Sequence, residues 1–143
     1  TAIEVWSRSG TWIKTFPGKQ SGFRAVAFRP DGQAIAVGNT DNTITIWNPD
    51  GSQRRVLTGH PKAVEALAFS PDANLLVSAD SSGMMKLWNQ DGALLKTIPA
   101  HDAGVWHLDF SRDGTMFASA SRDKTVKLWK PDGSLITTLQ GHK

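Results

Sequence analysis

Cysteine is absent from the 143 residues of this chain. Disulfide bonds, thiolate-bound zinc and thiol catalysis are therefore excluded at once. A chain without thiols also suits a reducing compartment, so the sequence predicts a cytoplasmic location.

Long hydrophobic runs and dense blocks of charge are also missing. No stretch approaches the roughly 18 apolar residues of a membrane helix, and the opening residues lack the basic and apolar segments of a signal peptide. The net charge is +3, from 16 lysines and arginines against 13 aspartates and glutamates, and the basic residues are scattered. Because nonspecific nucleic-acid binding needs clustered positive charge, we expect neither a membrane nor a nucleic acid as partner.

What the chain does contain is an internal repeat. Four tryptophans stand 41 residues apart, namely Trp6, Trp47, Trp88 and Trp129. Four further pairs keep the same step, namely Gly18-Lys19, Gly59-His60, Ala100-His101 and Gly141-His142. A repeat of about 40 residues that ends in an aromatic strand is typical of a propeller blade. The repeat therefore favours surface recognition over catalysis as the function.

The unit 59–99 shows how one repeat is built from strands. The step from Val64 to Leu67 is three residues, where a regular strand requires two, so we expect a β-bulge near positions 65–66. Pro71-Asp72 predicts a tight turn before a second strand over 75–79. A third strand alternates strictly up to Trp88, and an outer strand follows over 94–98.

The expected fold is all-β, a β-propeller array of about three and a half blades, each with four antiparallel strands. The full blades are 18–58, 59–99 and 100–140, preceded by the last two strands of a partial blade at 1–17 and followed by the start of a further repeat at 141–143. A single blade cannot bury both of its faces, so stacking must stabilise the array. Because the chain begins in mid-repeat without methionine, we expect part of a larger propeller first and an oligomeric ring second.

Three sequence motifs resemble those of WD-repeat β-propellers over essentially the whole chain. They are Gly59-His60, the Phe-Ser-Pro-Asp stretch at 69–72, and the Ser-Arg-Asp-Lys-Thr-Val-Lys-Leu-Trp run at 121–129. The resemblance implies a non-catalytic scaffold for protein assembly, with no cofactor, in a ring of typically seven blades. Periodicity alone indicates the architecture and not this function.

The resemblance also implies a hydrogen-bonded chain inside each blade, from histidine to serine, aspartate and tryptophan. The blade 100–140 matches completely, with His101, Ser119, Asp123 and Trp129. The blade 59–99 keeps His60, Ser78 and Trp88 but has Ser82 where aspartate is expected. The blade 18–58 keeps Asp41 and Trp47 but has Lys19 and Val37 in the other positions. We therefore predict weaker internal hydrogen bonding in these two blades.

Two catalytic interpretations are possible and both are disfavoured. His101, Ser119 and Asp123 are the residue types of a hydrolase triad, but no glycine elbow precedes the serine, and partial copies recur at the blade period. His101, Asp102, His107 and Asp109 could be read as metal ligands, but they straddle the expected bulge and only His101 belongs to a repeated column. We expect no catalytic residue and no metal.

Partner-binding residues are expected where repeat positions change identity. The bulge column contains Arg24, Glu65 and Trp106, and the column before the turn aspartate contains Thr40, Ser81 and Arg122. In the family both columns lie on the face around the mouth of the central channel. We therefore expect a protein or peptide partner there, with Trp106 as the strongest contact.

Alternatives to this site remain open. Trp106 could instead fold over and cover the channel lining. His107 replaces the alanines of the other blades and is unassigned, while Arg54 and Arg55 read as solvated edge charges that discourage sheet pairing. The alternative function is purely structural, as a segment whose partners are further propeller blades, from the parent chain or from a homo-oligomer.

Overall fold

The computed structural model describes residues 2–17 and 22–141, which form strands and turns without any helix. The predictions for Lys19, His142 and the ends of the units 1–17, 18–58 and 141–143 lie partly or wholly outside these residues. Within the described ranges, no helix is available that could cross a membrane. The strands are β1 (Ala2–Trp6), β2 (Trp12–Pro17), β3 (Phe23–Phe28), β4 (Ile35–Asn39), β5 (Ile44–Trp47), β6 (Gln53–Leu57), β7 (Val64–Phe69), β8 (Leu75–Asp80), β9 (Met84–Asn89), β10 (Leu94–Pro99), β11 (Val105–Phe110), β12 (Phe117–Ser121), β13 (Thr125–Trp129) and β14 (Leu135–Gln140).

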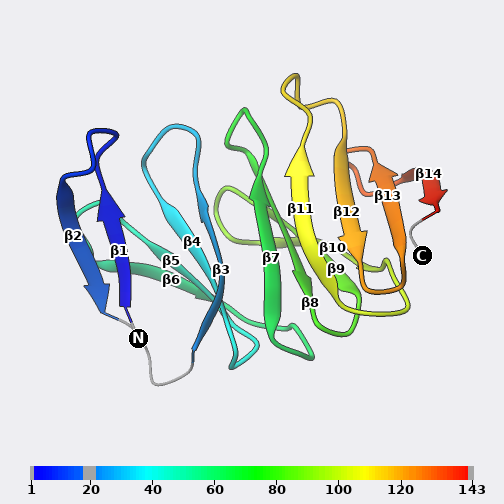
Figure 1. Ribbon diagram of the computed structural model, residues 1–143, viewed down its shortest axis with the longest axis horizontal. Helices are drawn as coiled ribbons and strands as arrows, with labels where there is room; N and C mark the ends of the chain where they lie inside the picture. Colours follow the sequence, from blue (N-terminus) through cyan, green and yellow to red (C-terminus); the bar gives the residue numbers. More distant parts are fainter. Residues whose placement is uncertain (1, 18–21, 142–143) are drawn as a thin grey trace.

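The strands form four separate antiparallel sheets. One sheet pairs β1 with β2, and the other three are four-stranded, with orders β3-β4-β5-β6, β7-β8-β9-β10 and β11-β12-β13-β14. Figure 1 shows the sheets following one another along the molecule, with the first strands β3, β7 and β11 side by side. The expected all-β fold with four-stranded blades is confirmed.

Each four-stranded sheet carries a β-bulge near the start of its first strand. In β7, Val64 pairs with Asp80 and Ala66 pairs with Ala79, so Glu65 has no opposite residue. The same shift leaves out Arg24 in β3 and Trp106 in β11. A bulge bends its strand and re-aims the extra side chain, so the predicted bulge is found in all three blades.

The antiparallel connections divide the turns between two ends of the array. We call one end the bulge rim, because it carries the bulge residues Arg24, Glu65 and Trp106 together with the β4–β5, β8–β9 and β12–β13 turns. The opposite end is the hairpin rim, whose β3–β4, β7–β8 and β11–β12 turns lie along the top of Figure 1. The Asp-Gly turns that enter the fourth strands also belong to the hairpin rim. Gly92 adopts φ +78° in one of them, a left-handed conformation that glycine tolerates best.

The hydrophobic core lies between the sheets rather than within any one of them. Sheets β7–β10 and β11–β14 bury the largest cluster, which contains Met85, Leu87 and Phe117. Burial of one such side chain contributes about 2 kcal/mol. Between sheets β3–β6 and β7–β10 the backbones approach closely, since a Cβ on Gly38 would lie 2.7 Å from the Val64 carbonyl oxygen. Stacking of neighbouring sheets therefore supplies the apolar burial that a single sheet lacks.

Candidate functional site

The bulge rim brings both predicted columns together. Backbone N–H groups of Thr40, Ser81 and Arg122 donate to carbonyl oxygens of Gly22, Ala63 and Gly104, over 2.9, 3.0 and 2.9 Å. Each bond ties the turn after the second strand to the segment that enters the first strand of the same sheet. The side chains of the two columns are therefore presented by a fixed backbone.

Trp106 is the most exposed large apolar residue of the rim, with 63% of its surface accessible. The Arg122 guanidinium lies 5.3 Å from the centroid of the indole, which is a cation–π contact. The same guanidinium pairs with the Glu65 carboxylate, at 3.3 Å from Nη2 to Oε1. Trp106 in β11 and Glu65 in β7 thus fix the orientation of Arg122 from two neighbouring sheets. The Trp106 indole keeps an exposed face.

A groove of about 210 Å³ runs along the first strands beside these residues. Arg24, Glu65, Trp106 and His107 line it together with apolar residues of the three strands. Arg24 is exposed and has no hydrogen bond or ion pair to any residue that the structure describes. The groove therefore combines an open aromatic surface, one unpaired cation and one carboxylate that is already paired.

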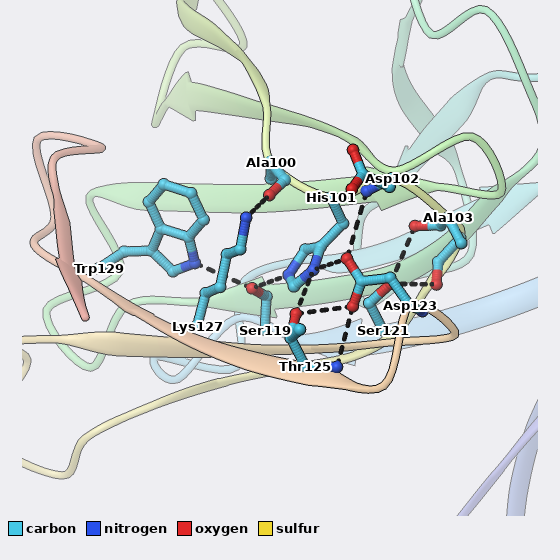
Figure 2. A network of polar contacts seen from close by, with 11 residues as sticks. Ala100, His101, Asp102, Ala103, Ser119, Ser121, Asp123, Thr125, Lys127 and Trp129 are labelled. Carbon is cyan, nitrogen blue, oxygen red and sulfur yellow. Dashed lines mark hydrogen bonds and ion pairs between the residues drawn. The ribbon is translucent and has the colours of Figure 1, made fainter. Parts of the chain in front are cut away.

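Behind the rim, the sheet β11–β14 contains the four residues that the resemblance indicates, and Figure 2 shows them in contact. His101 Nδ1 lies 2.7 Å from Asp123 Oδ2, and His101 Nε2 lies 2.7 Å from Ser119 Oγ. The Trp129 indole N–H donates to Ser119 Oγ over 2.9 Å. Because a carboxylate only accepts, Nδ1 carries the imidazole proton, and the Ser119 hydroxyl donates to Nε2.

Burial and the carboxylate act in opposite directions on this histidine. Burial lowers the pKa of His101 more than the Asp123 hydrogen bond and charge raise it, so the net shift is downward. Burial also raises the pKa of Asp123, but hydrogen bonds from Thr125 and His101 outweigh it and hold that pKa well below its ordinary value. At neutral pH the pair is therefore a neutral imidazole and an ionised carboxylate.

These distances are those of a hydrolase triad, but the surroundings do not suit one. Ser119 is 0% exposed, and its oxygen already accepts the Trp129 N–H. A nucleophile must reach the reacting carbon of its substrate. The arrangement is therefore suited to holding the sheet together. Among the described residues, no three His, Asp or Glu side chains are placed to hold a metal ion.

The prediction of weak hydrogen bonding in the blade 59–99 is wrong. His60 Nδ1 lies 2.9 Å from Asp80 Oδ2, His60 Nε2 lies 2.7 Å from Ser78 Oγ, and Trp88 donates to Ser78 over 2.8 Å. The carboxylate comes from the last residue of β8 rather than from the turn position of Ser82. Ser82 instead donates to Asp80 through its backbone N–H and its hydroxyl. An acidic residue two positions before the expected one was the signal that the sequence offered.

The sheet β3–β6 contains a different set of contacts. Val37 is fully buried where the other sheets have serine, and the Trp47 indole N–H has no hydrogen-bond partner among the described residues. Asn39 Nδ2 donates to Thr43 and Thr45 at 3.0 Å each. Asp41 caps its own turn by accepting from the backbone N–H of Thr43 at 3.2 Å. Asp41 thus lies in the β4–β5 turn, and Trp47 is the last residue of β5.

Comparison with known families agrees with this geometry. The model of the WD domain, G-beta repeat, matches three segments, at residues 10–48, 51–89 and 92–130. The chain belongs to the WD40 repeat family. Each matched segment contains the last strand of one sheet and the first three strands of the next. The segment 51–89, for example, contains β6 followed by β7, β8 and β9.

Two solved WD40 structures are similar to this chain at a TM-score of 0.85 and 30% sequence identity. They are titled "Structure of U3-55K" and "Crystal structure of RRP9 WD40 repeats". The alignments cover 90% of this chain but only 42% and 41% of those chains, so this chain spans about two fifths of their length. No match was found among curated proteins.

Proposed function

We propose that this WD40 chain is a non-catalytic scaffold that binds a protein or peptide partner on its bulge rim. The observation that carries the proposal is Trp106, which is 63% exposed at a position where the other blades have Arg24 and Glu65. The other two blades have charged side chains at this repeat position, so it is not a core position of the propeller. Burial in the core therefore does not account for a tryptophan there. Exposed tryptophans are enriched among the residues that dominate binding energy.

The contacts around Trp106 support a prepared binding surface. Arg122 fixes one side of the indole and is itself held by Glu65, whose side chain is only 12% exposed. An indole that is already oriented loses little conformational entropy when a partner covers it. Arg24 at the far side of the groove adds an unpaired positive charge for a carboxylate or carbonyl group of the partner.

The experiment is selection of peptides from a displayed random library on the purified protein, followed by affinity measurement on variants. Trp106→Ala should weaken the selected peptides at least tenfold, as expected for a central hot spot. Trp12→Ala is the matched control, because Trp12 is 52% exposed but belongs to β2, outside the rim. Equal affinities for the Trp106→Ala variant and the unaltered chain would reject the site, provided that circular dichroism shows both to be folded.

A second function is favoured by two uncovered apolar surfaces. At one end of the array β1 and β2 expose Trp6, Trp12 and Ile13, and at the other β14 exposes Leu135, Ile136 and Leu139. Such surfaces are typical of interfaces, and we propose that further propeller blades cover them. Light scattering tests this role, since it requires either the parent propeller or discrete higher-mass rings and is contradicted by a stable folded monomer. The cytoplasmic location stays a prediction.

A further inference from the structure

A second groove lies at the hairpin rim, between the sheets β3–β6 and β7–β10. Its floor is apolar and includes Ile46, Leu57, Phe69 and Leu76, and its edge carries Arg54 and Arg55. The groove is narrow, with a volume of about 30 Å³. A space of this size suits a small aliphatic side chain better than an aromatic ring.

Two residues at this groove are smaller than the residues at the same repeat positions of the next junction. Leu76 occupies the repeat position of Phe117, whose buried ring stacks on Trp129 with centroids 6.3 Å apart. Ala34 occupies the repeat position of Leu75, which packs against the core between β7–β10 and β11–β14. The two junctions thus have side chains of different size at the same two repeat positions.

The positive charge at this groove is also exceptional within the array. At each junction a long basic side chain lies over the glycine of the neighbouring Asp-Gly turn, namely Lys14 over Gly51, Arg55 over Gly92 and Lys96 over Gly133. Lys14 donates to the Asp50 carbonyl, and Lys96 donates to the Asp132 carbonyl at 3.4 Å. Neither Arg55 nor Arg54 has a hydrogen bond or ion pair within residues 2–17 and 22–141.

We propose that this groove binds an acidic peptide segment that carries a small aliphatic side chain between its carboxylates. The aliphatic side chain fills the space above Leu76, and the flanking carboxylates pair with Arg54 and Arg55. Guanidinium groups bind carboxylates through charge-assisted bonds that are stronger than neutral ones. Arg29 adds little charge, because it is already paired with Asp31 at 3.2 Å. Arg55, expected to be a solvated edge charge, therefore becomes a binding residue.

The site is independent of the bulge rim, because it lies at the opposite end of the strands. Charge complementarity selects the ligand: two unpaired cations stand beside an apolar floor, so an anion without an apolar group leaves the floor uncovered. A neutral apolar peptide leaves the arginines unpaired. Both parts of the ligand are needed, and each can be removed separately in a probe peptide.

The test uses three blocked pentapeptides and the amide spectrum of the isotope-labelled protein. The probes are Glu-Glu-Leu-Glu-Glu, its all-glutamine counterpart with the central leucine kept, and its counterpart with central glycine. The acidic leucine peptide should shift the amides of Leu57 and Gly92 in a saturable way, and the other two should bind about tenfold more weakly or not at all. Added salt should weaken the binding. No saturable shift, equal binding by the glutamine peptide, or shifts confined to residues around Trp106 would overturn the proposal.

Two variants and one control variant sharpen the result. Arg54→Gln with Arg55→Gln should reduce affinity at least tenfold, whereas Lys96→Gln, the matched change at the next junction, should leave it unchanged. Leu76→Phe places in the groove the ring that the next junction has, and should abolish binding while the spectrum stays that of a folded protein. Retained binding in either the arginine variant or the Leu76→Phe variant would overturn the proposal.

Discussion

The sheets β7–β10 and β3–β6 are neighbours built on the same repeat, yet their interiors are stabilised differently. In β7–β10, Asp80, His60, Ser78 and Trp88 form one continuous buried chain of hydrogen bonds. In β3–β6, Val37 replaces the serine, and the Trp47 ring contacts Phe16 edge-on, with centroids 5.8 Å apart. The same tryptophan position thus serves a polar network in one sheet and apolar packing in the other.

The comparison shows that the hydrogen-bonded chain is one means of stabilising a blade and that the fold does not depend on it. Both sheets have the same strand order and the same bulge. What differs is the consequence of a substitution. A buried network loses a whole set of bonds when one member is removed, whereas an apolar contact loses only its own area.

The largest effect is expected from removing the carboxylate of the hydrogen-bonded chain in the sheet β7–β10. Asp80→Ser leaves the buried His60 ring without its acceptor, and should cost about 3 kcal/mol of unfolding free energy. Adding Ser82→Asp reproduces the arrangement of Ser121 and Asp123 in the last sheet and should restore most of the loss. Urea denaturation of both variants measures the difference. A double variant no more stable than the single one would show that the two carboxylate positions are not interchangeable.

The sequence predicted the blades well because their signals are local and repeated. Alternation up to Trp88 and the three-residue step from Val64 to Leu67 specify a strand and a bulge wherever they occur, and both are present. The candidate rim could also be located, since a position that changes identity from repeat to repeat can be read from the sequence.

The source of the carboxylate could not be read in this way. Position 82 is the expected one in the family, and only the three-dimensional path of the chain shows that Asp80, at the end of β8, reaches the His60 ring. The contact between Arg122 and Glu65 was missed for a similar reason. It joins residues of different sheets that are 57 positions apart, and the blade period contains no information about such pairs.

An intermediate effect is expected from replacing tryptophan by phenylalanine in the two sheets. Trp88→Phe removes a hydrogen bond of 2.8 Å to Ser78, whereas Trp47→Phe removes an N–H that has no partner in the described chain. The two indoles are buried to a similar extent, so the lost apolar contact is comparable. Trp88→Phe should therefore cost about 1 kcal/mol more than Trp47→Phe, and Trp129→Phe should resemble Trp88→Phe. Equal losses by urea denaturation would remove the distinction between the sheets.

The smallest effect is expected from a modest decrease in pH, and it should arise in the sheet β11–β14. Burial holds the pKa of His101 below its ordinary value of 6.5. Between the two values the unfolded chain binds more protons than the folded one, so stability falls as the pH drops below about 6.5. The pKa of Asp123 is also lowered, and its contribution is present above its ordinary value of 3.8 and lost as the pH falls through the folded value.

Both groups therefore predict a loss of stability in acid, in two separate ranges. Urea midpoints should be constant from pH 8 to 7, fall gradually below pH 6.5, and fall again in strong acid. His101→Gln removes the titrating ring but keeps a polar side chain, so the slope just below pH 6.5 should become smaller in this variant. If the slope is unchanged, the protonation that weakens the fold near neutral pH occurs elsewhere than in the sheet β11–β14.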